Sequence, residues 1–280
     1  MSTVTKHNTL DVRPRDMPYA DNSHQIFFSR TFVDPPRLPL GLCELDIDRK
    51  ANISANAMVE DITKESAKYD ITSESQTILY QATSMSYNLA PGNLEILSGH
   101  HMRNMTGTPK GPESVRIDFD HPFVTPPKVL VFIRAFDFNK DRNWRLETTA
   151  SCVDTEGFTL NIRTWGDSIL YAAQATWVAY PEDRQHIFSA SVHTEDLEQA
   201  LAWDRPLDRF RGEIKFSTEF WERPVVFVAL NKFDIDCRCN FTLKIDVPQN
   251  SVTTTGLKWR FTPEDNRRLY LAGATIIAVD

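Results

Sequence analysis

The chain has 280 residues, and 41% of them are hydrophobic, a share that excludes a disordered protein and allows one to three domains. Its net charge of −7 argues against a nucleic-acid partner, because such a partner generally requires a basic surface. The four cysteines lack zinc-ligand spacing, which is typical of a protein in a reducing compartment.

The amino-terminal residues 1–23 are polar and rich in proline and aspartate, and they predict an extended lead-in that adds one edge strand to the domain after it. They include no apolar stretch of signal-peptide length. The longest apolar run, residues 224–230, is far too short to span a bilayer and predicts a buried strand. We expect a protein without a transmembrane segment that is cytoplasmic or is released without a classical signal peptide.

Three segments repeat one pattern at nearly constant offsets. Each has two phenylalanines and a proline spaced by four residues, an acid ten residues later, an asparagine six further on, and a closing Leu-Tyr pair. The members are Phe28, Phe32, Pro36, Asp46, Asn52 and Leu79-Tyr80; Phe119, Phe123, Pro127, Asp137, Asn143 and Leu170-Tyr171; and Phe216, Phe220, Pro224, Asp234, Asn240 and Leu269-Tyr270. The repeats predict three domains, over residues 1–90, 91–181 and 182–280.

Within each repeat, apolar and polar residues alternate between turns rich in glycine and proline, which predicts short antiparallel strands and an all-β protein. The Phe-Phe-Pro spacing preserves strand parity, so both phenylalanines should lie on one face of a sheet. One short helix is predicted over residues 194–203. Thr194 suits its N-cap, Glu195 and Asp196 suit its first turn, and Pro206 ends it.

Motifs of the common catalytic classes are missing from the sequence: there is no G-x-S-x-G, H-E-x-x-H, P-loop or G-x-G-x-x-G. Residues 137–141 begin like a calcium loop, but an EF-hand needs glycine and glutamate where Arg142 and Thr148 stand. No acidic pair recurs as a glycosidase would require. We expect neither an enzyme nor a metal or cofactor site.

The central repeat carries an ordered series of aromatic, proline and polar residues. The series is Phe119, Pro126-Pro127, Asp137, Asn143, Arg145, Gly157-Phe158, Thr164-Trp165, Tyr171 and Trp177. It resembles the H-type lectin family, the fold of snail agglutinins and of the carboxy-terminal domain of slime-mould discoidins. The resemblance implies a six-stranded antiparallel β-sandwich per repeat and binding of galactose-type sugars, often N-acetylgalactosamine. Family members usually form trimers with sugar sites near subunit boundaries, so three copies in one chain imply an intrachain pseudo-trimer.

The same resemblance implies the sugar-binding residues. Arg145, Trp165 and Tyr171 stand at positions that contact the ligand in family members, and Gly166 stands where some members have histidine. An aromatic ring packs on the C–H face of a pyranose, and a guanidinium donates to neighbouring hydroxyls. The alternative for Trp165 is a core position. The alternative for Tyr171 is a structural role, because this tyrosine recurs in all three repeats.

The other two repeats lack these residues. Ser54 and Thr242 align with the arginine, and Glu74 and Glu264 with the tryptophan, so we expect altered or lost sites there. The aspartate that family members place before the first phenylalanine is missing near Thr108. We expect a neighbouring repeat to supply an acid in its place. The candidates are Asp16, Asp21, Asp204 and Asp208.

The sequence therefore predicts a lectin that binds glycans or glycoconjugates non-covalently and without a metal, with further oligomerisation left open. The alternative is a structural or protein-interaction scaffold of lectin-like domains that has lost sugar binding.

Overall fold

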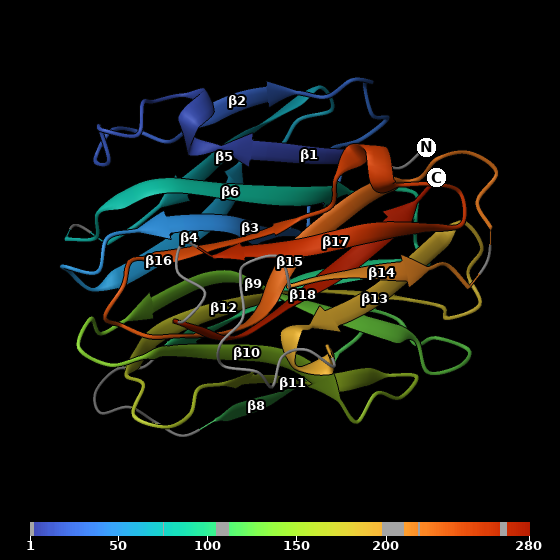
Figure 1. Cartoon of the computed structure of the whole chain (residues 1–280). Coiled ribbons are helices and arrows are strands. Elements are labelled where there is room, and N and C mark those ends of the chain that lie inside the picture. Colours follow the sequence, from blue (N-terminus) through green and yellow to red (C-terminus); the bar gives the residue numbers. More distant parts are fainter. Residues whose placement is uncertain (1–2, 75, 105–111, 198–209, 218, 264–267) are drawn as a thin grey trace.

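A computed structural model describes residues 3–74, 76–104, 112–197, 210–217, 219–263 and 268–280 (Figure 1). The first repeat contributes β1 (Thr3–Asn8), β2 (His24–Phe27), β3 (Leu40–Ile47), β4 (Ile53–Glu60), β5 (Ser66–Thr72) and β6 (Leu79–Asn88). The second contributes β7 (Leu97–Asn104), β8 (Glu113–Asp118), β9 (Lys128–Phe138), β10 (Trp144–Ser151), β11 (Gly157–Arg163) and β12 (Leu170–Tyr180). The third contributes β13 (Ile187–His193), β14 (Arg211–Lys215), β15 (Val225–Ile235), β16 (Phe241–Asp246), β17 (Gly256–Pro263) and β18 (Leu269–Val279).

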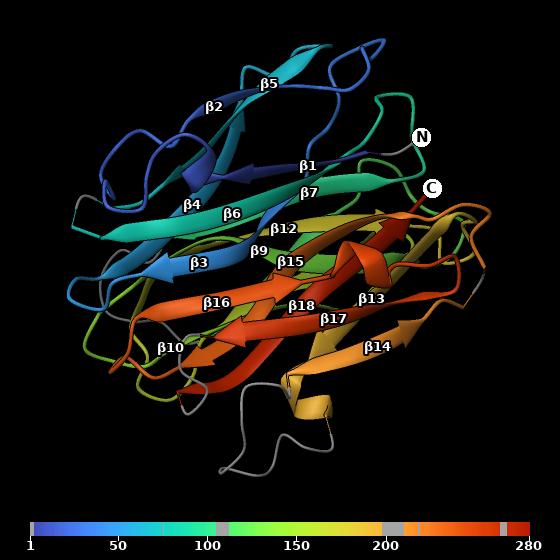
Figure 2. The same ribbon diagram turned by 45° about the horizontal axis from the view of Figure 1, so that its top comes forward.

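These strands form three six-stranded antiparallel sheets, and every sheet is shared by two repeats. The strand orders are β1-β6-β3-β16-β17-β14, β13-β18-β15-β10-β11-β8 and β2-β5-β4-β9-β12-β7. Figures 1 and 2 show this sharing in the sequence colours, since the orange strand β16 lies beside the blue strand β3 in both views. Each repeat thus has six strands, as predicted, but it splits them into two three-stranded halves that extend two different sheets. The three repeats close into a ring.

Local patterning explains the strands. Burial alternates along β17, whose residues are in turn covered and exposed, as expected for a strand with one face on the core. The second half of β12 is buried on both faces, because its sheet is packed within the ring. The lead-in forms the edge strand β1, which pairs with β6. Short 3₁₀ turns make up the helical content of the described residues, and none of their helices is long and apolar enough to cross a membrane.

One continuous hydrophobic core joins all three repeats. At its centre, the ring of Phe136 from the second repeat lies 5.4 Å from that of Phe233 and 5.5 Å from that of Phe241, both from the third. Aromatic contacts at such distances add about 0.5–1.5 kcal/mol each beyond the buried area. The repeats therefore depend on one another for their cores.

The Phe-Phe-Pro series has a different conformation from the one predicted. Phe119 and Phe123 follow β8 rather than lying in it, and their N–H groups donate to the carbonyls of Glu156 (2.7 Å) and Thr155 (2.8 Å). Their rings nevertheless contact each other edge to face at 5.0 Å on the same side, as the spacing requires. The equivalent phenylalanine pairs of the first and third repeats pack in the same way, at 5.3 and 5.1 Å.

The recurring asparagines link each repeat to the next. The side-chain Oδ1 atom of each asparagine accepts a hydrogen bond from a backbone N–H of a neighbouring repeat, at 3.1 to 3.3 Å. The pairs are Asn52 with Lys140, Asn143 with Cys237, and Asn240 with Arg49. Because the same hydrogen bond forms at all three boundaries, the recurring asparagine has a structural role in joining the repeats.

The predicted helix begins only as a 3₁₀ turn, η2 (Thr194–Asp196). Thr194 does not act as an N-cap, because its hydroxyl accepts from the N–H of Ala272 on β18 at 3.0 Å. The remainder of the predicted helix, residues 198–203, falls outside the described residues.

Candidate functional site

Each boundary between repeats places the recurring acid of one repeat opposite a polar residue of its neighbour. The cross-strand partners are Ser54 with Asp137, Arg145 with Asp234, and Thr242 with Asp46. The positions that align with Arg145 therefore lie at the boundaries between repeats. The ends of β3 and β15, which carry two of the acids, lie at the opposite end of the molecule from the chain termini (Figure 1).

At the boundary between the second and third repeats, the Arg145 guanidinium is held by two carboxylates. Its Nη1 donates to Asp167 Oδ1 at 2.7 Å, and its Nε lies 3.2 Å from the Asp234 carboxylate. Nη1 also lies 3.3 Å from Ser168 Oγ. The Arg145 side chain is only 14% exposed, whereas that of Asp167 is 58% exposed. The result is a fixed donor flanked by one buried and one solvent-facing acceptor.

The two carboxylates titrate differently because their surroundings differ. The hydrogen bond from Arg145 lowers the pKa of Asp167. Burial raises the pKa of Asp234, although Arg145 and the Trp165 indole oppose this by donating hydrogen bonds to it.

Gly166 allows the surrounding loop to pass close to the guanidinium. Its φ is +62°, a left-handed conformation that glycine adopts freely, and a Cβ placed there would lie 2.8 Å from Arg145 Nη1. The loop positions Trp165, which is half-buried and is contacted by Arg163, whose guanidinium carbon lies 6.0 Å from the ring centroid. The structure thus brings together Arg145, Trp165 and Gly166.

Tyr171 takes part in a different, recurring contact. Its hydroxyl accepts a hydrogen bond from Asn139 Nδ2 at 2.9 Å. The equivalent tyrosines of the other repeats donate to aspartates at the aligned position, at 2.9 and 3.0 Å; the pairs are Tyr80 with Asp48 and Tyr270 with Asp236. This link holds the turn after β3, β9 or β15 against the strand that closes the repeat.

Sequence reasoning missed two acids of the Arg145 cluster, Asp234 and Asp167. Asp234 belongs to the neighbouring repeat, and the signal for it was the acid that recurs in all three repeats. Asp21, proposed for this role, instead accepts from the backbone and hydroxyl of Ser23. Asp16 lies exposed in the lead-in. Residues Thr108, Asp204 and Asp208 fall outside the described part of the chain.

The other two boundaries differ from this arrangement. At the boundary between the third and first repeats, Asp46 accepts from Arg15 at 2.6 Å, and that guanidinium also lies 4.6 Å from the centroid of the Tyr80 ring. Glu264, which aligns with Trp165, falls outside the described residues. At the boundary between the first and second repeats, Ser54 Oγ accepts from the N–H of Glu74, in the segment after β5 of the same repeat, at 2.6 Å.

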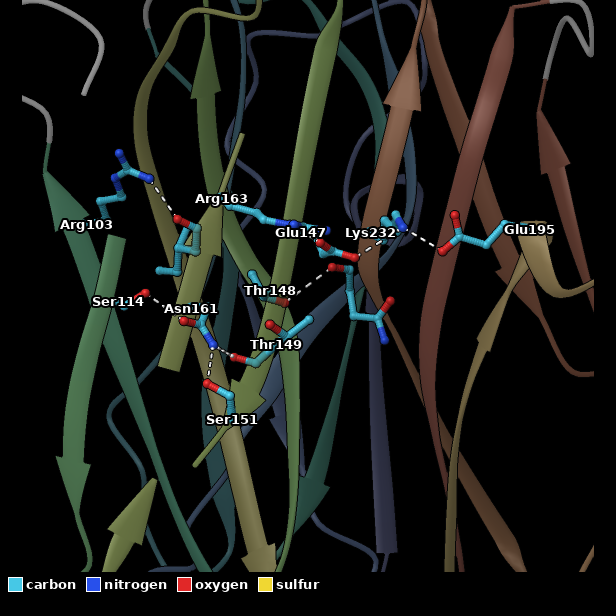
Figure 3. Close-up of polar contacts among 12 residues, drawn as sticks. Arg103, Ser114, Glu147, Thr148, Thr149, Ser151, Asn161, Arg163, Glu195 and Lys232 are labelled. Carbon is cyan, nitrogen blue, oxygen red and sulfur yellow. Dashed lines mark hydrogen bonds and ion pairs between the residues drawn. The ribbon is translucent and has the colours of Figure 1, made fainter. Parts of the chain in front are cut away.

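An ion-pair network lies two residues further along β10 and β15 from the Arg145–Asp234 pair, at the cross-strand pair Glu147 and Lys232 (Figure 3). Lys232 Nζ is 3.1 Å from Glu147 and 2.6 Å from Glu195, and Arg163 pairs with Glu147 from the other side. The Glu147 and Lys232 side chains are 8% and 7% exposed. Through Glu147 the network is linked to Arg163, the residue whose guanidinium faces the Trp165 ring.

Within the described ranges, no group of three or more histidine, cysteine, aspartate or glutamate side chains could hold a metal ion.

Three six-stranded antiparallel sheets around a common core define an all-β protein of the β-sandwich class. A sequence profile of the H-type lectin domain matches the chain three times, over residues 23–84, 114–180 and 211–279, which together make up most of its length. The chain belongs to the H-type lectin family, a family of carbohydrate-binding proteins.

Two further proteins show similarity to parts of the chain. A Fuscovulum blasticum protein described as ATP synthase subunits region ORF 7 is 32% identical over 74 residues, which are 26% of this chain and 64% of that protein. Among solved structures, recombinant discoidin II of Dictyostelium discoideum aligns with a TM-score of 0.28 and 14% identity. That alignment covers 53% of this chain and 74% of the discoidin chain.

Proposed function

We propose that this protein binds galactose-type glycans, including N-acetylgalactosamine, non-covalently and without a metal, at the boundary between its second and third repeats. The observation that carries the proposal is the Arg145 guanidinium, held between Asp167 and Asp234 beside the half-buried ring of Trp165. A pyranose needs a ring surface for its C–H face and fixed polar groups for its hydroxyls. This cluster offers both.

The hydrogen-bonding capacity of the cluster supports the proposal. A guanidinium has five N–H donors, and Arg145 directs Nε and Nη1 to protein acceptors. Among the described residues none accepts a hydrogen bond from its Nη2, and these donors are proposed to serve a sugar hydroxyl. The exposed carboxylate of Asp167 is an acceptor for a neighbouring hydroxyl.

The three repeats are proposed to act as a pseudo-trimer with one competent galactose-type site. The ring of shared sheets is compatible with a trimer-like assembly built from one polypeptide. Only the boundary between the second and third repeats has both an arginine and a tryptophan, at Arg145 and Trp165; the aligned residues of the other repeats are Ser54 and Thr242, and Glu74 and Glu264. A single shallow site of this kind binds with a Kd of about 1 mM, or about −4 kcal/mol.

Titration calorimetry with galactose and N-acetylgalactosamine, alongside sedimentation to fix the mass, tests this proposal. We expect about one sugar per chain and loss of binding in Trp165→Ala. A stoichiometry of about three, or strong agglutination of cells by a proven monomer, would contradict it, because cross-linking requires several sites.

A structural or protein-interaction scaffold is the second candidate function. It is favoured by the engagement of Arg145 with two carboxylates of the protein itself and by the changed residues at the other two boundaries. A lectin should be retained on a galactose column and elute when free galactose is added, whereas a scaffold without sugar binding should pass through. Turnover of a nitrophenyl glycoside would instead indicate an enzyme.

We also propose that the protein acts in the cytoplasm or after release without a classical signal peptide. Four free cysteines support this proposal: Cys43, Cys152, Cys237 and Cys239.

A further inference from the structure

The three repeat boundaries differ at the pair of residues two positions further into the sheet from the recurring acid. The cross-strand partners there are Glu147 with Lys232, Lys244 with Glu44, and Asn56 with Ala135. The first pair forms an ion pair at 3.1 Å (Figure 3), and the second forms one at 3.2 Å with the charges exchanged. The third pair has neither charge.

The uncharged pair Asn56 and Ala135 lies beside a cavity of about 200 Å³ at the boundary between the first and second repeats. Its lining includes Asn56, Glu74, Ala135, Asp137, Ala173 and Gln174. Pockets for drug-sized ligands measure about 300–1,000 Å³, so this cavity suits a ligand of monosaccharide size.

Two hydrogen-bond acceptors that line the cavity lack a donor among the described residues. Asn56 Oδ1 and Asp137 Oδ1 are both buried, and neither has a hydrogen-bond partner among the described residues. Leaving a buried acceptor unpaired costs about 1–3 kcal/mol, and more for a charged group. Glu74 adds a second carboxylate at the exposed rim. Burial, and then the charge of Glu74, raises the pKa of Asp137 to about 6.

The equivalent acids at the other two boundaries are each paired with a cation. Asp234 accepts from Arg145, and Asp46 accepts from Arg15. Within the described chain no arginine or lysine pairs with Asp137. The two basic residues nearest in sequence, Arg134 and Lys140, donate instead to the backbone carbonyls of Ala57 and Lys50. The cavity therefore has a carboxylate, that of Asp137, without the cationic partner that the equivalent acids have at the other two boundaries.

We propose that this cavity is a second binding site, for a monosaccharide that carries a free primary amine. The ammonium group would pair with Asp137 and Glu74 and donate to Asn56 Oδ1, and the Gln174 amide would meet a ring hydroxyl. An N-acetylated sugar lacks the positive charge and adds bulk, so it is excluded. This site lies on a different boundary from Arg145 and does not depend on sugar binding there.

Nuclear magnetic resonance of alanine methyl groups tests the proposal in place, because Ala135 and Ala173 line the cavity. The measurement uses the full chain with Trp165→Ala, which removes the ring of the Arg145 site. Galactosamine should shift these two methyl signals, and galactose and N-acetylgalactosamine should bind at least about tenfold more weakly, a difference of about 1.4 kcal/mol. An absence of shifts with galactosamine, or equal affinity for galactose, would overturn the proposal.

Two variants separate the charge from the shape of the cavity. In the Trp165→Ala chain, Asp137→Asn should weaken galactosamine binding at least about tenfold. In the chain that keeps Trp165, the same substitution should leave galactose binding at the Arg145 site unchanged. Ala135→Lys, which imitates Lys232, should also abolish binding, because its own ammonium would occupy the cavity. Asp46→Asn, which changes the equivalent acid at another boundary, is the matched control and should leave the methyl shifts intact. Full galactosamine binding by Asp137→Asn would overturn the proposal.

Discussion

The carboxylate of Glu147 and the ammonium of Lys232 lie 3.1 Å apart across the boundary between the second and third repeats, and both side chains are buried. A buried ion pair contributes little net stability when it is complete, but it is costly to break, because the remaining charge stays in a poorly solvated site. This pair therefore makes the boundary sensitive to single substitutions.

Lys232→Ala should lower the free energy of unfolding by about 3 kcal/mol, because Glu147 loses its buried partner and retains Arg163 alone. Adding Glu147→Asn, which reproduces the Asn56–Ala135 pair of the first boundary, should recover part of this loss. Chemical denaturation of both single variants and the double variant measures the coupling. Strictly additive effects would show that the pair is not coupled.

Arg145→Ala should abolish galactose binding and also lower the free energy of unfolding by about 1–3 kcal/mol, because the buried carboxylate of Asp234 loses its charged donor and keeps only the Trp165 indole. Asp167→Asn is the control for stability. Its side chain is 58% exposed, so we expect a change of at most about 1 kcal/mol. Calorimetry with sugar, together with thermal unfolding, separates the two roles of Arg145. An Arg145→Ala variant of unchanged stability would contradict the structural role.

Trp165→Ala should weaken sugar binding by at least about tenfold while changing the free energy of unfolding by no more than about 1 kcal/mol. The side chain is half-buried, and the Asp234 carboxylate that loses the Trp165 indole keeps its hydrogen bond from Arg145. A glycan array with the wild type and this variant gives the binding result. A stability loss of about 3–5 kcal/mol would instead identify Trp165 as a core residue.

Asp137→Asn should raise the free energy of unfolding at pH 8 and have little effect at pH 4. Burial, and then the charge of Glu74, raises the pKa of Asp137 from 3.8 to about 6, so the folded state binds the proton more tightly than the unfolded state does. The resulting stabilisation is present below about pH 4 and is lost as the pH rises to about 6. After allowance for solvent screening, the expected gain at pH 8 is about 1–3 kcal/mol.

Denaturation curves of Asp137→Asn and the wild type between pH 4 and pH 8 provide the measurement. Asp46→Asn, which removes a carboxylate already paired with Arg15, is the control and should show no gain at pH 8. A gain for Asp137→Asn that does not change with pH would indicate a cause other than titration of Asp137.

Local sequence determined the strands, the three repeats and the family. Strand alternation and turn residues are short-range features, and the Phe-Phe-Pro series and the recurring acid and asparagine mark the same positions in each repeat. Arg145, Trp165 and Gly166 were predicted to share one site, and they lie together in the structure. Their sugar-binding role stays a prediction.

Only the tertiary structure decided which strands pair between repeats, because hydrogen bonding between distant strands leaves no local trace in the sequence. That pairing sets Asp234 against Arg145, 89 residues away, and gives the recurring acid its partner. It also leaves the cavity beside Ala135, where the neighbouring boundaries hold ion pairs. Thr194 shows the same dependence, since a hydroxyl suited to cap a helix instead bonds to β18. The Thr194 hydroxyl could accept from a backbone N–H of its own turn or of β18, and the packing of β18 beside it decides for β18.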